Sequence, residues 1–177
     1  GRGFFSKPEA KESLRLLKER TGSEYVIFAL AALQDTAHST KVDFKGKHMP
    51  DDEELIDMMK YARRLGLKVI LKPTVNVKDG TWRAHINFFD IDVPCEPKWS
   101  DWFESYTVYQ LHYARIAEEQ QCEMYIVGCE MVQTERREGE WRQLVTDVKR
   151  VYSGPVTYNT DKYQEGNVKW WDAVDVI

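Results

Sequence analysis

The sequence lacks several features that would assign it to a class at once. Its 177 residues include only three cysteines, Cys95, Cys122 and Cys129, at spacings that fit neither a zinc site nor a dense disulfide framework. We therefore expect buried free thiols. No apolar run approaches the roughly 20 residues that span a bilayer, and no signal peptide opens the chain. These absences argue against a zinc domain, a disulfide scaffold and a membrane protein.

Charge and glycine patterns exclude two more classes. The net charge is −4, and lysine and arginine are scattered, so no basic stripe is available for a nucleic-acid backbone. No Gly-x-Gly-x-x-Gly or P-loop pattern follows an apolar segment, which argues against nucleotide binding. Aromatic residues are plentiful instead, with six Trp and nine Tyr. Such rings bind sugars well, but they are equally good core residues.

Short apolar segments alternate with longer amphipathic ones. The first helix is expected between a capping box of Ser6 with Glu9 and Gly22, the second after Asp51, and the third after a loop over 73–99. The first strand is apolar on both faces, as in a strand covered on both sides. Helices that alternate with buried strands predict a parallel α/β sheet. The five predicted strands are 25–31, 69–71, 124–127, 156–158 and 173–177.

Two α/β architectures fit this alternation, an open doubly wound sheet and a (β/α)8 TIM barrel. The barrel is favoured because polar residues follow the strands, and barrel enzymes build their active sites at that edge. A complete barrel has eight strands in about 250 residues. We therefore expect residues 1–177 to form a single barrel domain that lacks the first strand and the last two. The polar strand-end residues are 34–38, Lys72, Glu130 and 159–161.

Glu130 directly follows the apolar segment 124–127, which places it at the expected mouth of the barrel. A carboxylate there can serve as a general acid or base. The alternative is a structural ion pair with Lys72 or Arg136, because such networks also gather carboxylates at strand ends. Position alone leaves these two interpretations equal.

The loop around residue 80 offers a second candidate. Asp79 and Gly80 predict a turn, and Trp82 followed by Arg83 places an apolar platform beside a hydrogen-bonding fork. Sugars present flat C–H faces edged with hydroxyls, so this pair suits them. Trp82 can equally anchor the loop against the barrel.

Other polar residues have weaker signals. Lys72 ends its strand, where a desolvated lysine can form a Schiff base, so a lyase is an alternative to an ion-pair or substrate-donor role. His38 and His85 lie in loops without a metal-ligand pattern, which favours substrate contact or a surface position. The acidic stretch 90–96 lacks calcium-loop spacing, so a solvated loop and no metal site are expected.

Taken in order, the motifs resemble glycoside hydrolase family 113 over essentially the whole chain. They are segments 34–40, 66–73, 79–83, 128–131, 151–158 and 170–175. The resemblance implies a retaining β-mannanase of the large clan of (β/α)8-barrel glycosidases, which cleaves β-1,4-mannosidic bonds in mannan or manno-oligosaccharides. It further implies a monomer without a cofactor, cytoplasmic or secreted in a bacterium. Another β-glycan hydrolase of the clan and a non-catalytic carbohydrate-binding barrel stay open.

The resemblance also implies site residues. In that clan the acid/base glutamate follows the fourth strand, which Glu130 matches, and the nucleophilic glutamate follows the seventh, which has no counterpart in residues 1–177. Many clan members place Asn before the acid/base to hold the sugar's 2-hydroxyl. Cys129 stands there, a poor hydrogen-bonding substitute, so Asn159 is the candidate for that contact. The expected lining of the sugar cleft is Trp82, Arg83, His38, Lys72, Asn159 and Cys129.

Overall fold

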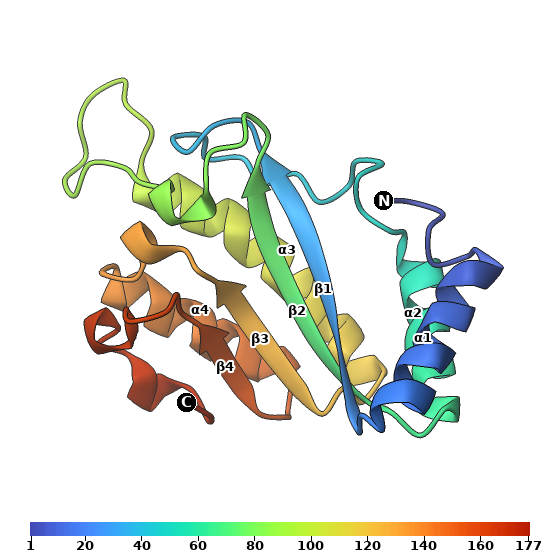
Figure 1. Ribbon diagram of the computed structural model, residues 1–177. Helices are drawn as coiled ribbons and strands as arrows, with labels where there is room; N and C mark the ends of the chain where they lie inside the picture. Colours follow the sequence, from blue (N-terminus) through green and yellow to red (C-terminus); the bar gives the residue numbers. More distant parts are fainter.

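The computed structural model describes residues 1–177 and contains one parallel sheet. The strands are β1 (Tyr25–Gln34), β2 (Lys68–Val77), β3 (Met124–Cys129) and β4 (Val156–Asn159), hydrogen-bonded in that order (Figure 1). The helices are α1 (Pro8–Thr21), α2 (Asp52–Arg64), α3 (Trp99–Glu119) and α4 (Glu138–Val151), with four short 3-10 helices, η1 (Arg83–His85), η2 (Val132–Thr134), η3 (Glu165–Asn167) and η4 (Trp171–Ala173). None of the helices has the length and apolar character to cross a membrane.

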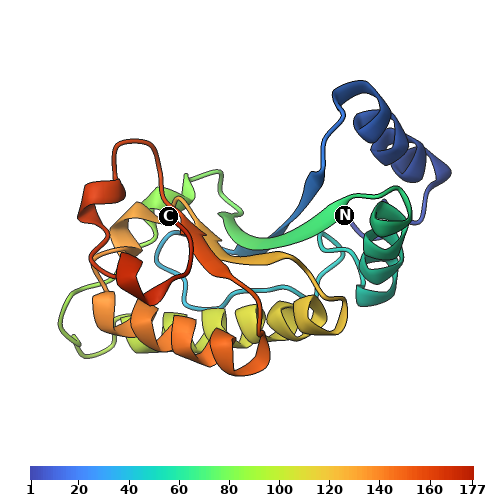
Figure 2. The same ribbon diagram turned by 90° about the horizontal axis from the view of Figure 1, so that it is seen from below.

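The strand order confirms the predicted barrel class. Each strand pairs with the next along the chain, whereas in a doubly wound sheet the order of the strands reverses at a switch point. Figure 2 shows α3 and α4 along one face of the sheet and no helix over the opposite face. A doubly wound sheet carries helices on both faces. The chain is therefore a four-stranded portion of a (β/α)8 barrel.

The fifth predicted strand, 173–177, is wrong. Its first residue belongs to η4, and only one backbone hydrogen bond, from Asp175 N–H to Val156 O at 2.8 Å, joins the segment to β4. The start of the segment is held in this 3-10 turn by the hydrogen bonds Ala173 N–H to Trp170 O at 3.0 Å and Val174 N–H to Trp171 O at 3.2 Å. An apolar run alone does not form a ladder.

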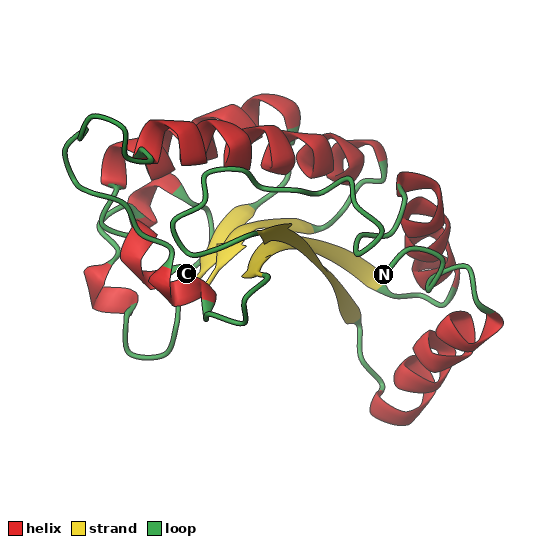
Figure 3. Ribbon diagram, turned by 90° about the horizontal axis from the view of Figure 1, so that it is seen from above, coloured by secondary structure: helices red, strands yellow, loops and turns green.

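The prediction that β1 is covered on both faces is also wrong for the described chain. Phe28, Leu30 and Ala32 are buried, but Tyr25 and Ile27 on the alternate face are 47% and 49% exposed. This open face lies opposite the long helix, as the view from above shows (Figure 3). In a closed barrel the same face is the interior, where strands pack against each other's side chains.

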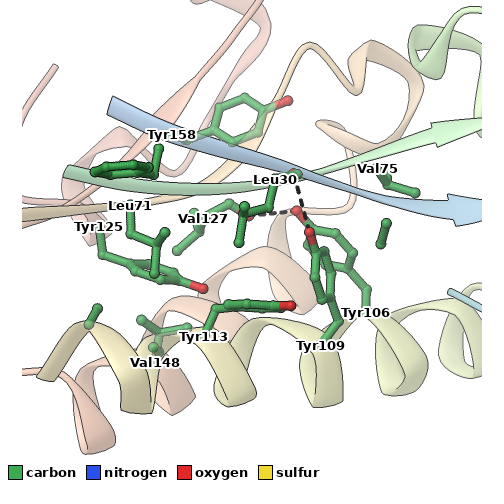
Figure 4. Close-up of a cluster of buried hydrophobic side chains, with 14 of the residues drawn as sticks. Leu30, Leu71, Val75, Tyr106, Tyr109, Tyr113, Tyr125, Val127, Val148 and Tyr158 are labelled. Atoms are coloured by element: carbon green, nitrogen blue, oxygen red, sulfur yellow. Dashed lines mark hydrogen bonds between the residues drawn. The ribbon is translucent and has the colours of Figure 1, made fainter. Parts of the chain in front are cut away.

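Aromatic side chains of α3 tie the helix to the sheet. Tyr106 donates its hydroxyl to Val127 O at 2.7 Å, and Tyr109 donates to Thr74 O at 2.8 Å. Figure 4 shows both tyrosines rising from the helix toward the strands. Each ring fills the core while its polar tip is satisfied by a strand carbonyl. These tyrosines therefore have a structural role, because their hydrogen bonds hold α3 against β2 and β3.

Helix boundaries were predicted with mixed success. Asp51 caps α2 as expected, because its carboxylate accepts the Glu54 N–H at 2.8 Å. The capping box of Ser6 with Glu9 is wrong, since Lys7 is the N-cap of α1 and makes no side-chain bond. The Ser6 hydroxyl lies 3.2 Å from the carboxylate of Glu54, which is 5% exposed. Ser6 therefore donates its hydroxyl to the Glu54 carboxylate and does not accept an N–H from the first turn of α1.

The loop predicted from residue 73 begins later than expected. β2 continues through Pro73 to Val77, although proline cannot donate to the ladder. Pro73 lies opposite Leu30 of β1, and its carbonyl accepts a hydrogen bond from Gln110 of α3 at 3.1 Å. As a consequence, Asn76 belongs to the strand and lies at its carboxyl end.

Candidate active site

The carboxyl ends of β2, β3 and β4 bring polar residues together. Glu130 comes directly after β3, and its N–H donates to Asn159 O at 2.8 Å. Cys129 is the register partner of Asn159 across the β3–β4 pair. The prediction that Lys72 ends its strand is wrong, because β2 runs from Lys68 to Val77, but Lys72 Nζ still lies 3.4 Å from the Asn159 side-chain oxygen. The structure therefore gathers four of the seven predicted site residues from these strands, and Arg83 of η1 joins them as a fifth beside Glu130.

Glu130 has an unusual backbone conformation, with φ at +55°. A side chain other than glycine is strained there, and such residues concentrate at active sites, where the surrounding structure holds them. Two hydrogen bonds stabilise this backbone conformation: the Glu130 N–H donates to Asn159 O at 2.8 Å, and the Met131 N–H donates to the Tyr158 hydroxyl at 3.0 Å. The Glu130 side chain remains 37% exposed, so a substrate can reach its carboxylate.

Arg83 is the cation beside Glu130. Its Nη1 lies 3.7 Å from Glu130 Oε2, too far for a hydrogen bond, while its Nη2 donates to Asn76 Oδ1 at 2.6 Å. The guanidinium thus bridges the ends of β2 and β3. Arg83 is fixed by Asn76 and leaves both oxygens of Glu130 free to bond a substrate.

The two ion-pair partners predicted for Glu130 are wrong. Lys72 lies against Asn159, as described above, and Arg136 holds Asp90 at 2.8 Å and Asn87 at 2.8 Å. Arg136 instead ties down the acidic loop, whose Asp92 and Glu96 are exposed as expected. No group of His, Cys, Asp and Glu side chains is arranged to hold a metal ion.

Cys129 is a neutral neighbour of the site. Burial raises the pKa of its thiol, and its Sγ lies 3.7 Å from the Asn159 side-chain oxygen, to which it donates a weak hydrogen bond. Cys122 is buried as expected, and burial raises the pKa of its thiol to about 12. The expectation of burial is wrong for Cys95, which is exposed in the loop before α3.

His38 lines a hollow next to the strand ends, and Trp82 packs against another lining residue, His85. The hollow has a volume of about 450 Å³ and a mostly polar lining of Thr36, Ala37, His38, Asp79, Thr81, His85, Asn87 and Gln133. His38 Nδ1 is 2.8 Å from Asn87 O, which fixes the ring at the wall. Trp82 packs edge-on against His85 at 5.9 Å and is 46% exposed. That exposure favours a platform over a buried anchor.

Sequence reasoning missed two residues of this region, Asn76 and Glu135. Asn76 was assigned to a loop because Pro73 ended the predicted strand. The spacing from Lys72 could have identified Asn76, since residues four apart in a strand lie on the same face of the sheet. Glu135, which is 2% exposed, carried no signal, because a charged residue in a polar segment is normally solvated.

Comparison with known proteins identifies relatives over the full chain. The model of Glycoside Hydrolase Family 113 matches residues 1–177. A structure described as a GH113 β-1,4-mannanase is 69% identical and has a TM-score of 0.98, covering 98% of this chain and 56% of its own. The GH113 β-mannanase AaManA from Alicyclobacillus acidocaldarius, solved in complex with ManMIm, is 40% identical with a TM-score of 0.93, covering 98% and 55%.

A more distant structure shares the fold alone. The Pseudomonas stutzeri endoglucanase Cel5A is 14% identical with a TM-score of 0.55, and the match covers 87% of this chain and 44% of that one. No curated protein matches the sequence. The chain spans a little over half the length of the two GH113 structures.

Proposed function

The chain belongs to glycoside hydrolase family 113, and from that premise we propose that the protein is a retaining β-mannanase. It hydrolyses β-1,4-mannosidic bonds in mannan or manno-oligosaccharides, and residues 1–177 belong to its single catalytic barrel domain. One observation carries the proposal: Glu130 is a strained, accessible carboxylate at the carboxyl end of a barrel strand, beside Arg83 and Asn159. Barrel enzymes place catalytic groups at that edge.

Glu130 acts in this proposal as the general acid/base. In the first step its proton passes to the glycosidic oxygen as the C1–O bond breaks, while a second carboxylate attacks C1 and forms a covalent glycosyl-enzyme. In the second step the ionised Glu130 takes a proton from water, whose oxygen attacks C1 and releases the second carboxylate. That nucleophile follows the seventh strand in the clan, outside the four strands described here. The two carboxyl groups of a retaining pair lie about 5–5.5 Å apart.

The neighbours of Glu130 bind and orient the sugar. Lys72 and Asn159 offer donors and an acceptor to the hydroxyls of the mannosyl unit at the cleavage point, and Arg83 supports the carboxylate. Lys72 Nζ lies 3.4 Å from the Asn159 side-chain oxygen, which suits a hydrogen-bond donor to the sugar, and membership of a glycoside hydrolase family disfavours the Schiff-base alternative. Cys129 fills space beside Asn159 and donates a weak hydrogen bond to its side-chain oxygen.

The proposed function predicts both a substrate preference and a stereochemical outcome. We expect the polypeptide, produced as encoded with whatever flanks residues 1–177, to hydrolyse β-mannan about tenfold or more faster than cellulose. Mannose and glucose differ only in the orientation of the C2 hydroxyl, and a site whose polar groups bond one orientation leaves them unpaired with the other. Proton NMR of the early products should show the β anomer first, since double displacement inverts C1 twice. An α anomer first, or a preference for glucan, contradicts the proposal.

We propose Trp82, which packs against the lining residue His85, as a sugar platform beside the hollow. We expect Trp82→Ala to raise KM for mannan about tenfold with little change in kcat, because stacking at a distance from the broken bond stabilises ground and transition states alike. Trp82→Phe keeps a flat ring and should stay close to wild type. An unchanged KM together with a lowered melting temperature would mean that Trp82 is a loop anchor instead.

A further inference from the structure

Glu135 is a buried carboxylate that the proposed reaction does not use. It follows η2, five residues after Glu130, and is 2% exposed. Its Oε1 accepts the Tyr158 hydroxyl at 2.7 Å and the Thr160 hydroxyl at 2.8 Å, while its Oε2 is buried without a partner. Burial raises the pKa of the Glu135 carboxyl, which reflects the cost of ionising it there. The hydrogen-bond partners of Glu135 connect this costly buried carboxylate to Glu130.

Tyr158 connects Glu135 to the residue after the acid/base. The phenol has one proton, and it is donated to Glu135, so a lone pair of the same oxygen accepts the Met131 N–H at 3.0 Å. A carboxylate acceptor polarises the hydroxyl and makes its oxygen a better acceptor in turn. Glu135 thereby fixes the direction in which the Tyr158 hydroxyl is oriented.

The Met131 amide matters because Glu130 is in the left-handed region, at φ +55°. The peptide group between Glu130 and Met131 turns with the backbone of Glu130, so its N–H can meet Tyr158 only while that conformation lasts. If the acceptor is lost, this peptide is free to relax toward an unstrained region. The Glu130 carboxylate would then leave its place beside Arg83.

We propose that Glu135 and Tyr158 are positioning residues that hold Glu130 in the backbone conformation required for acid/base catalysis. The inference rests on the proposed function of Glu130. Neither residue contacts the substrate in this arrangement: Glu135 acts through Tyr158, and Tyr158 acts through the Met131 amide. A misplacement of about 1 Å at a catalytic group costs on the order of a hundredfold in rate, so a single hydrogen bond can matter here.

Two substrates separate positioning of the acid from a general structural role. On mannan, kcat/KM of the intact polypeptide should fall about 30-fold in Tyr158→Phe and about tenfold in Glu135→Gln, whose amide oxygen still accepts from Tyr158. On a dinitrophenyl β-mannoside, kcat/KM of both variants should stay within about threefold of wild type, because kcat/KM reports the first step and that leaving group needs no proton. Equal losses on both substrates, or no loss on mannan, would overturn the inference.

Tyr152→Phe is the matched control. Tyr152 is also buried, and its hydroxyl donates to Cys122 O at 2.6 Å, between α4 and β4 and at the far end of the strands from Glu130. Its loss removes a buried hydrogen bond of the same kind without touching the site. We expect a lower melting temperature and equal, small effects on the two substrates.

Amide hydrogen exchange tests the link without any turnover. Met131 should exchange about tenfold faster in Tyr158→Phe than in wild type, whereas Tyr125 N–H, bonded to Pro155 O at 2.9 Å, should keep its rate. An unchanged Met131 rate, or a parallel rise at both amides, contradicts the inference. If wild type hydrolyses neither mannan nor the aryl mannoside, the proposed function fails, and the exchange result still decides whether Tyr158 holds the Met131 amide.

Discussion

Glu130→Gln is expected to lower kcat on mannan about a thousandfold while the protein stays folded. Glutamine has the shape of glutamate but no proton to give to the glycosidic oxygen. The substitution also removes no hydrogen bond, because the nearest cation, Arg83, lies 3.7 Å away and is held by Asn76. Steady-state kinetics with mannan and a thermal melt followed by circular dichroism measure the two halves of this expectation.

A control separates this loss from a general charge effect. Glu96 is an exposed carboxylate in the loop before α3, and Glu96→Gln removes the same charge with no change at the strand ends. We expect that variant to keep full activity. If Glu130→Gln hydrolyses mannan at close to the wild-type rate, then the ion pair with Arg83 is the whole role of Glu130, and the catalytic assignment is lost.

Gly128→Ala is expected to cost about 1–3 kcal/mol of unfolding free energy, the usual range for overpacking a core. A methyl group at Gly128 would lie 2.8 Å from Met131 Cε, 2.9 Å from the Tyr106 hydroxyl and 3.1 Å from Tyr158 Cε2. The methionine end can move, but both tyrosines are held by their hydroxyl hydrogen bonds. The strain therefore falls on the side chains directly beneath Glu130.

We accordingly expect Gly128→Ala to lose mannan hydrolysis beyond what its stability explains. Gly139→Ala provides the comparison, because nothing lies within 4 Å of the added carbon and the position is in the first turn of α4. That variant should gain up to about 0.5–1 kcal/mol, as alanine does over glycine in a helix. Urea unfolding of both variants measures the difference. Equal stability of Gly128→Ala and wild type would contradict the packing described here.

The sequence was sufficient for the parts of the fold that depend on local pattern. Apolar runs that alternate with amphipathic stretches predicted four strands and four helices, and the position of Glu130 after one of those runs placed it at the correct edge. The fifth strand failed because an apolar run does not reveal whether a neighbour will pair with it. In this chain, the segment begins inside η4 and makes a single backbone hydrogen bond to β4.

The candidate site was predictable only where residues end a strand. Cys129, Glu130 and Asn159 follow from strand ends, whereas Lys72, predicted to end its strand, lies within β2 and meets Asn159 from there. The partner of Glu130 did not follow, because Arg83 reaches it from a loop 47 positions earlier. The Glu135–Tyr158 pair could not be found either, since a buried carboxylate has the same sequence signal as an exposed one.

Azide rescue of Glu130→Gly tests the role of Glu130 most directly. Glycine adopts φ +55° without strain, so the backbone is kept while the acid/base is removed. With a dinitrophenyl β-mannoside, the first step still forms the glycosyl-enzyme, and azide, an anion that needs no general base, attacks it from the face that Glu130 has vacated. We predict faster turnover with azide and a β-mannosyl azide product. An α-mannosyl azide would make Glu130 the nucleophile, and the absence of both rescue and azide product would remove it from the reaction.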